Sequence, residues 1–320
     1  MQPQKYQTTS KSDSKFVIVD GNALLHRAYH AYPHTLRTSK GELVNAVYGF
    51  SRLMLTLIND LKPNYLTIAF DTAAPTFRHL DYVGYKAHRP KMEDELASQL
   101  DLLGKLVRAM KVKSYAIEGF EADDVIGTLV EKVGNTSIEV DTYIVTGDMD
   151  ALQLISNNTF VYSPNKGLSH PKIWKNEDVF AKFGFGPDLV VDYKALRGDP
   201  SDNIPGVKGV GDKTATELIK TWGSLESIYR NIDKITPPKL ANKLALEFEM
   251  ASLSKNLALI RRDVPLRLSL KECSFAGFSD NNKLLDFFEE MEFLSLVKYI
   301  SSTRIANQEE KDDNQLTLGV

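Results

Sequence analysis

The stretch FVIVD, residues 16–20, joins four apolar residues to a terminal aspartate. Two later stretches have the same design. YLTIAFD at 65–71 ends in one acid, and DTYIVTGDMD at 141–150 ends in two. Short apolar runs without strict alternation indicate strands that are covered on both faces, as in a parallel sheet.

Helical patterns separate these strands. Apolar residues recur at helical spacing in 41–61, in 90–110 and in the stretch EGFEADDVIGTLV at 118–130. Strands that alternate with helices predict an α/β fold with a parallel sheet. From about Asp199 the chain becomes rich in proline and glycine, and short helical patterns follow, ending with a helix expected at 281–300.

These changes in composition and in the pattern of apolar residues predict the domain organisation. We expect a flexible tail at 1–15, an α/β core at 16–195, a helical region at 196–300 and a disordered tail at 301–320. The core and the helical region are expected to form one functional domain, because the motifs described below run through both.

Composition excludes several classes of protein. With 320 residues, 42% of them hydrophobic, the chain can form a sizeable core. The single Cys273 excludes a disulfide framework and a cysteine-based zinc site, and suits a reducing cytoplasm. The polar N-terminus lacks the apolar segment of a signal peptide, and no run is long enough to span a membrane. The net charge of −3 does not by itself indicate a nucleic-acid partner.

Carboxylates are expected to gather at one edge of the sheet, because ligands of parallel sheets bind at the carboxyl ends of the strands. The candidate acids are Asp20, Asp71, Glu121, Asp123, Asp124, Asp148, Asp150, Asp199 and Asp202. Each one alone is explained by helix capping or turn formation. Together they would repel one another by on the order of a few kcal/mol for each close pair, so a cation must lie among them.

The donor set is all oxygen, because these motifs contain neither cysteine nor histidine. Oxygen ligands favour a hard cation, Mg²⁺ or Mn²⁺. The acids are too many for one such ion, so we expect two, as in metal-assisted cleavage of phosphodiesters.

Two stretches provide positive charge for a polyanion. In FRHLDYVGYKAHRPK, residues 77–91, cations alternate with aromatic rings, which suits unstacked bases, although a solvated loop also explains the stretch taken alone. In GVKGVGDKTATELI, residues 206–219, a glycine turn precedes a helix and could bind phosphate. The candidate nucleic-acid contacts are Arg78, Tyr82, Tyr85, Lys91, Gly206, Lys208, Gly209, Gly211 and Lys213.

Taken in order, the motifs resemble the 5′-3′ exonuclease domain at the N-terminus of bacterial DNA polymerase I, within the 5′ nuclease or flap endonuclease superfamily. The matching stretches are FVIVDGNALLHRAYHA, LTIAFDTAAPTFRHLDYVGYKAHR, EGFEADDVIGTL, IVTGDMDALQLI and YKALRGDPSDNIPGVKGVGDKTATELI. The resemblance implies a PIN-like parallel-sheet nuclease core with a helical arch and a C-terminal helix-hairpin-helix region. No polymerase segment follows, so a stand-alone nuclease is expected.

The resemblance also implies roles for single residues. Asp20, Asp71, Glu121 and Asp123 would surround one metal, and Asp148, Asp150 and Asp202 the second, with Asp123 near both. Asp199 and Asp124 complete the acidic set, and Asp124 is either an outer ligand or a helix cap. Lys86 and Arg89 match arch positions that contact the scissile phosphate, and the glycine hairpin is similar to those that hold duplex DNA with K⁺.

The expected substrates are DNA with 5′ ends or flaps and RNA–DNA hybrids, in primer removal and repair by a cytoplasmic monomer. Two alternatives stay open: a PIN-type ribonuclease, which would be shorter and lack the hairpin, and a non-catalytic DNA-junction binder, which would not need every acid. A haloacid dehalogenase phosphatase is excluded by Asn22, where a second aspartate is required. Gln315, Leu316 and Leu318 resemble a sliding-clamp peptide that lacks its terminal aromatic residue.

Overall fold

The computed structural model describes residues 12–164, 171–278 and 280–303. The chain forms two compact units, and each is described by itself. Of the described residues, those within 12–20, 69–91 and 115–268 belong to the first unit, and those within 21–68, 92–114 and 269–303 belong to the second. Every acid singled out in the sequence belongs to the first unit. In the described ranges, no helix combines the length and the apolar character needed to cross a membrane.

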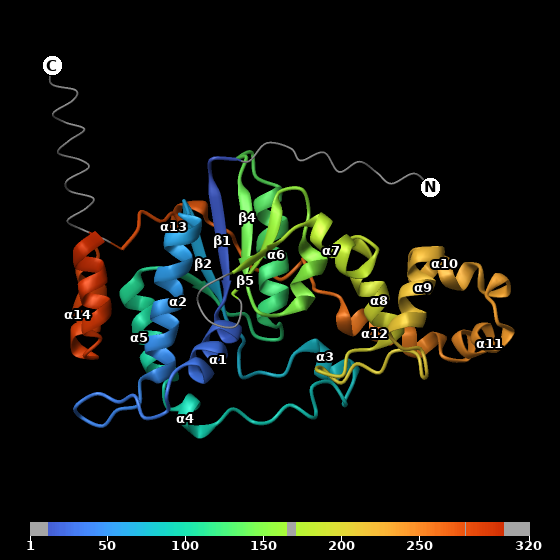
Figure 1. The fold of residues 1–320 in the computed structure, drawn as a ribbon, viewed down its shortest axis with the longest axis horizontal. Coiled ribbons are helices and arrows are strands. Elements are labelled where there is room, and N and C mark those ends of the chain that lie inside the picture. Colours follow the sequence, from blue (N-terminus) through green and yellow to red (C-terminus); the bar gives the residue numbers. More distant parts are fainter. Residues whose placement is uncertain (1–11, 165–170, 279, 304–320) are drawn as a thin grey trace, which may run out of the picture. The chain divides into compact units, whose positions relative to one another are not determined.

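Four strands of the first unit lie side by side in the order β1 (Lys15–Asp20), β4 (Asp141–Val145), β5 (Thr159–Ser163) and β6 (Lys172–Trp174). β1, β4 and β5 are parallel, and β6 runs antiparallel to β5. β4 is buried along its whole length and β1 from its second residue, which confirms the expectation of strands covered on both faces. Helix α6 (Ala122–Gly134) packs against β1 and β4 (Figure 1).

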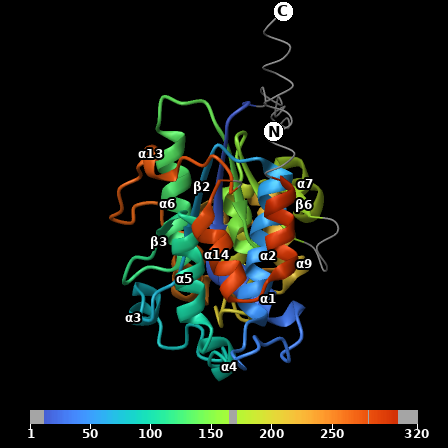
Figure 2. The same ribbon diagram turned by 90° about the vertical axis from the view of Figure 1, so that its left-hand side faces the viewer.

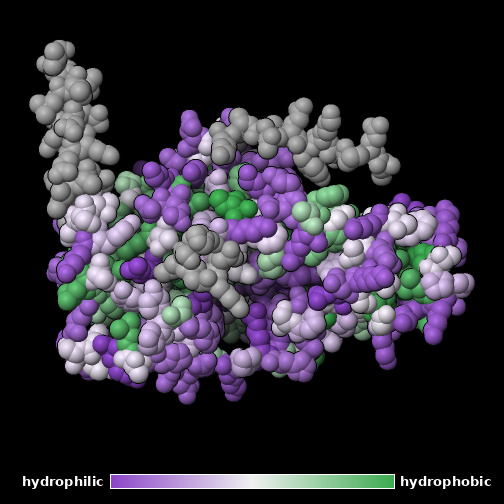
Figure 3. Space-filling view, viewed as in Figure 1, coloured by the Kyte–Doolittle hydropathy of each residue, from purple (hydrophilic) through white to green (hydrophobic). Residues whose placement is uncertain are grey.

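The helices after the sheet pack around α8 (Val190–Arg197), which contacts both α9 (Asp212–Trp222) and α12 (Phe248–Ala258) (Figure 1). The other elements of this unit are α3 (Phe77–Asp81), η1 (Met149–Leu154), α7 (Asn176–Phe183), η2 (Pro187–Leu189), α10 (Leu225–Arg230), η3 (Ile232–Lys234) and α11 (Pro238–Leu246). Figure 3 shows a largely hydrophilic surface over α7 to α11, with small hydrophobic areas.

A segment without regular structure, residues 259–264, runs along α6. Its backbone N–H groups donate to side chains instead of to a sheet or helix: Ile260 to Gln153 at 2.9 Å, and Val264 to Thr128 at 3.1 Å. The approach is close at Gly127, where a Cβ atom would lie 2.6 Å from the Ile260 side chain. Side chains of α6 and η1 therefore fix the path of this segment.

In the second unit, α2 (Asn45–Leu61) packs on α1 (Gly21–Ala31) and α5 (Leu100–Met110), and α5 also contacts α14 (Asn282–Glu290) (Figure 2). The remaining elements are β2 (Tyr65–Ala69), α4 (Asp94–Ala97), β3 (Lys113–Tyr115) and α13 (Leu270–Cys273). The prediction of a single helix at 281–300 is wrong. The chain turns after Glu290, with Glu292 at a φ of 60°, and becomes helical again from residue 294.

Candidate metal centre and nucleic-acid interface

The ends of the parallel strands β1 and β4 bring the first acids together. Asp20 ends β1 and accepts a hydrogen bond of 2.7 Å from the Thr146 hydroxyl just after β4. Asp148 begins η1, and its carboxylate accepts from the backbone N–H of Asp150 at 2.9 Å. Burial raises the pKa of Asp123, and the nearby charges of Asp148, Asp20 and Asp150 raise it further. These acids therefore share one electrostatic environment, as the strand pattern predicts.

The start of α6 uses its acids to satisfy the helix's own N–H groups. Glu121 is the N-cap, and its carboxylate accepts from the backbone of Asp124, while the Asp124 carboxylate accepts from the backbone N–H of Glu121 at 3.1 Å. Asp71 accepts from the N–H of Ala122 at 2.7 Å. The helix dipole favours negative charge at this end of α6.

Asp124 and Arg78 form a buried, two-point ion pair. The two guanidinium nitrogens donate to the two carboxylate oxygens at 2.7 and 2.8 Å, and Arg78 also donates to the carbonyls of Leu257 and Leu259. Asp124 is fully buried and Arg78 is 2% exposed. This arrangement opposes the predicted metal role of Asp124 and the predicted DNA contact of Arg78, because each group already satisfies the other. Of the two roles left open for Asp124, helix capping is the one observed.

Lys86 lies beside two acids, Glu121 and Asp202. Its ammonium is 3.0 Å from Glu121 and 3.7 Å from Asp202, and Arg89 is 3.4 Å from Asp202. Burial alone would lower the pKa of Lys86, but Glu121 and Asp202 raise it above the ordinary value. Tyr85 donates to both acids, at 3.0 and 3.3 Å. Its ring is 3% exposed, so the prediction that Tyr85 stacks on a base is at odds with the structure.

The segment that carries Lys86 is not the helical arch expected from the resemblance. α3 ends at Asp81, and turns follow as far as Arg89. Lys86 has a φ of 53°, outside the range of a right-handed helix, and its N–H donates to the carbonyl of Asp202 at 2.9 Å. The Asn203 side chain donates to the carbonyl of Gly84 at 2.6 Å. These bonds to the 202–203 loop hold the turns in place of a helix.

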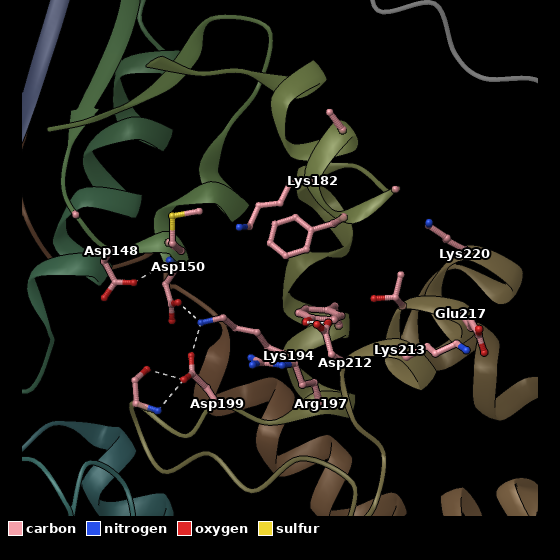
Figure 4. A pocket seen from close by; sticks show the side chains of 18 residues that line it. Asp148, Asp150, Lys182, Lys194, Arg197, Asp199, Asp212, Lys213, Glu217 and Lys220 are labelled. Atoms are coloured by element: carbon pink, nitrogen blue, oxygen red, sulfur yellow. Dashed lines mark hydrogen bonds and ion pairs between the residues drawn. The ribbon is translucent and has the colours of Figure 1, made fainter. Parts of the chain in front are cut away.

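Lys194 is a functional candidate that sequence reasoning missed. From α8, its ammonium reaches Asp150 and lies 2.5 Å from Asp199 (Figure 4). Although burial acts against the charged form, the two acids raise the pKa of Lys194, and the lysine holds the pKa of Asp199 at about 2. The signal was present in YKALRGD, where a lysine stands five residues before an acid at the end of a helix.

A cavity of about 1070 Å³ extends from these acids to α9. Asp148, Asp150 and Asp199 line one part of it, and Figure 4 shows cationic side chains around the rest, together with the acids Asp212 and Glu217. These cations are Lys182, Lys194, Arg197, Lys213 and Lys220. Of them, only Lys213 was predicted as a nucleic-acid contact. The cavity thus joins acids, which suit a metal, to cations, which suit phosphate.

The glycine hairpin precedes α9. Gly206 and Gly209 have φ values of 63° and 76°, and Gly211 is the N-cap of α9. A Cβ atom on Gly206 would lie 2.2 Å from the backbone nitrogen of Gly198, so only glycine fits. Lys208 is exposed here, as is Lys91 in the earlier segment, whereas Tyr82 packs against a buried cluster around Tyr85 and Leu257.

The predicted acids do not close into one tight cage. Within the described ranges, the only three potential ligands whose donor atoms lie within 4.8 Å of one another are His34, Glu93 and Glu95, which are exposed in the second unit. An open arrangement still fits Mg²⁺, which takes one or two carboxylates and keeps several waters. The repulsion felt by Asp123 is what a bound cation would relieve, so the residues present fit the metal.

Family models now decide the classification. The model for the N-terminal resolvase-like domain of the 5′-3′ exonucleases matches residues 15–184, and the model for their C-terminal SAM fold matches 185–281. The chain belongs to the 5′-3′ exonuclease family. The resemblance seen in the sequence is thereby confirmed.

Relatives and solved structures agree with this membership. The chain is 39% identical over 297 residues to DNA polymerase I of Bacillus caldotenax, covering 93% of this chain and 33% of that protein. It therefore spans about a third of the length of the curated relatives it matches. The bacteriophage T5 5′-exonuclease with bound zinc is 20% identical, with a TM-score of 0.62 over 87% of this chain and 98% of that one.

A second T5 structure, the flap endonuclease in a pseudo-enzyme–product complex with DNA and metal ions, is 18% identical. It has a TM-score of 0.64 over 89% of this chain and 99% of that one. At this identity the two structures show the shared fold, which is the PIN-like α/β fold with a C-terminal helical region that the sequence predicts.

Proposed function

We propose that this 5′-3′ exonuclease family member is a metal-dependent nuclease that hydrolyses phosphodiester bonds at 5′ ends and flaps of DNA, including RNA–DNA hybrids. The observation that carries the proposal is the cavity beside Asp148, Asp150 and Asp199, which is also lined by five cationic side chains, with Asp212 and Glu217 near them. A polyanion is attracted by the cations, and the acids provide oxygen ligands next to it.

The acids are proposed to hold two Mg²⁺ or Mn²⁺ ions. Burial and the charges of Asp148, Asp20 and Asp150 raise the pKa of Asp123, while lysines form ion pairs with Asp150, Asp199 and Asp202. When bound, such ions activate water and stabilise a leaving oxygen. Asp71 and Glu121 are proposed to support this site from the start of α6, where they accept backbone N–H groups.

The basic residues are proposed to bind and orient the substrate backbone. Lys86 stays protonated beside Glu121 and Asp202, so it is placed to donate to a phosphate oxygen near the metals. Lys213 and Arg197 would contact phosphates further along the cavity. The 206–211 hairpin would hold the duplex backbone through N–H groups other than those of Gly206, Val207 and Val210, which donate within the protein, with K⁺ as a proposed ligand.

The biological setting that we propose is primer removal and DNA repair by a monomer in the cytoplasm. The clamp-binding peptide proposed at Gln315, Leu316 and Leu318 lies outside the described residues, as do most of the two predicted tails. No structural observation favours a non-catalytic junction binder over an enzyme, since every acid of the pattern is present.

The test is a cleavage assay with a 5′-flap substrate, a blunt duplex and a single strand, in Mg²⁺ and in EDTA. We expect cleavage of the flap near its junction, none in EDTA, and a loss of at least about a hundredfold for Asp148→Asn. Asp233→Asn, an exposed acid on η3, is the matched control and should cleave like the parent chain. Metal-independent cleavage, or equal activity of Asp148→Asn and parent, would refute the proposal.

A further inference from the structure

Asp150 and Asp199 lie on either side of a single ammonium group. Asp150 and Asp199 share the ammonium of Lys194, which is 8% exposed. Asp199 is held further by Ser201, whose N–H and hydroxyl both donate to its other oxygen. The lysine thus occupies the place between two carboxylates where a cation is most stable.

An ion entering between Asp150 and Asp199 must first displace this ammonium, because Lys194 already forms ion pairs with both carboxylates. A metal ion therefore binds there only as far as it outcompetes the lysine.

We propose that Lys194 is an internal counter-cation that competes with the metal ion bound by Asp150 and Asp199 and so weakens the binding of that ion. The inference rests on the proposed function, because it takes these acids to be metal ligands. Lys194 is a positioning residue in this scheme, because it sets the affinity of the ion at Asp150 and Asp199.

The cavity has room for the displaced ammonium of Lys194. Lys194 lines the cavity together with Arg197 and Lys213, so its ammonium can swing from the acids towards the region expected to hold phosphate. The exchange would keep the charge of the cavity balanced. When the second ion is absent, lysine neutralises the acids, and when it is bound, lysine joins the cations that face the substrate.

The test measures metal binding without turnover. Mn²⁺ is titrated into the full chain without DNA, and the bound ion is counted by electron paramagnetic resonance. For the parent chain we expect a tight class and a weak class of Mn²⁺. Lys194→Met should tighten the weak class by about tenfold or more, the equivalent of at least about 1.4 kcal/mol. Lys194→Arg, which keeps the charge, should restore the weak affinity.

Lys255 provides a matched control, because it also bridges two acids, Asp192 and Glu226, each at 2.6 Å. Lys255→Met should leave both classes unchanged. If Lys194→Met fails to fold, Lys194→Gln tests the same point, since it removes the charge but keeps a donor. Unchanged or weaker binding in these variants overturns the inference while leaving the proposed function standing. A parent chain that binds no Mn²⁺, or whose binding is indifferent to Asp123→Asn, overturns both.

Discussion

Replacing Asp124 by asparagine should destabilise the first unit by about 3 kcal/mol or more, because a buried ion pair loses one partner. Asp124 accepts two bonds from Arg78 and one each from the N–H groups of Glu121 and Arg261. An asparagine has one acceptor oxygen, and its NH₂ group would face the guanidinium. Glu121, at 3.5 Å from Arg78, is the nearest remaining charge and compensates only in part, which places the loss at the lower end of the usual 3–5 kcal/mol.

The same substitution one residue earlier should act in the opposite direction. Asp123→Asn removes a carboxylate whose pKa is raised by burial and by three neighbouring acids. Without divalent ions, its loss should therefore stabilise the fold by on the order of 1 kcal/mol. In Mg²⁺ this advantage should disappear, and cleavage should be lost.

Urea unfolding in EDTA measures both effects. The two tryptophans, Trp174 on β6 and Trp222 on α9, belong to the first unit, so their fluorescence reports on the unit that carries both substitutions. A loss below about 1 kcal/mol for Asp124→Asn would mean that the pair with Arg78 is not the main support of α6. Equal destabilisation by both substitutions would refute the separation of the two acids into different roles.

Three other substitutions test the interface. Gly206→Ala should lower the free energy of unfolding by at least about 2 kcal/mol and abolish duplex binding. Gly211→Ala is the control and should change stability little, because its Cβ would meet no atom within 4 Å. Thermal unfolding measures the stability, and a titration with duplex DNA measures the binding. Lys213→Ala should reduce the slope of log affinity against log salt by about one, and an unchanged slope would mean that it contacts no phosphate. Lys86→Met should lower single-turnover cleavage more than DNA affinity, and an equal loss in both would assign Lys86 to binding alone.

The sequence predicts the sheet well because its signals are local. FVIVD and TYIVTGDMD are apolar over the length of a strand and end in acids, and β1 and β4 form there as parallel neighbours. Local patterns do not predict the structure of the segment after α3, where turns replace the expected helix. Lys86 has a positive φ and donates its N–H to Asp202, more than a hundred residues away, and neither feature can be detected from the spacing of apolar residues.

The site shows the same limit. Asp123 and Asp124 are adjacent and identical in type, yet burial and nearby acids raise the pKa of Asp123, whereas Asp124 pairs with Arg78. Arg78 resembles a DNA contact in the sequence because it stands among aromatic and basic residues, and only packing shows that it is buried. Lys194 has one partner, Asp199, five residues ahead in the sequence, but it is missed because its other partner, Asp150, comes from a different element. That the acids hold metals stays a prediction.

The segment 259–264 has a consequence for how the chain can be divided. Arg261, Ile260 and Val264 donate their backbone N–H groups to Asp124, Gln153 and Thr128, all of which precede residue 184, where the first family model ends. A fragment that stops there would expose the face of α6 at Gly127 and leave three polar side chains without these donors. Such a fragment should express poorly, and co-expression with residues 185–303 should recover soluble protein, because each half contains the hydrogen-bonding partners of the other.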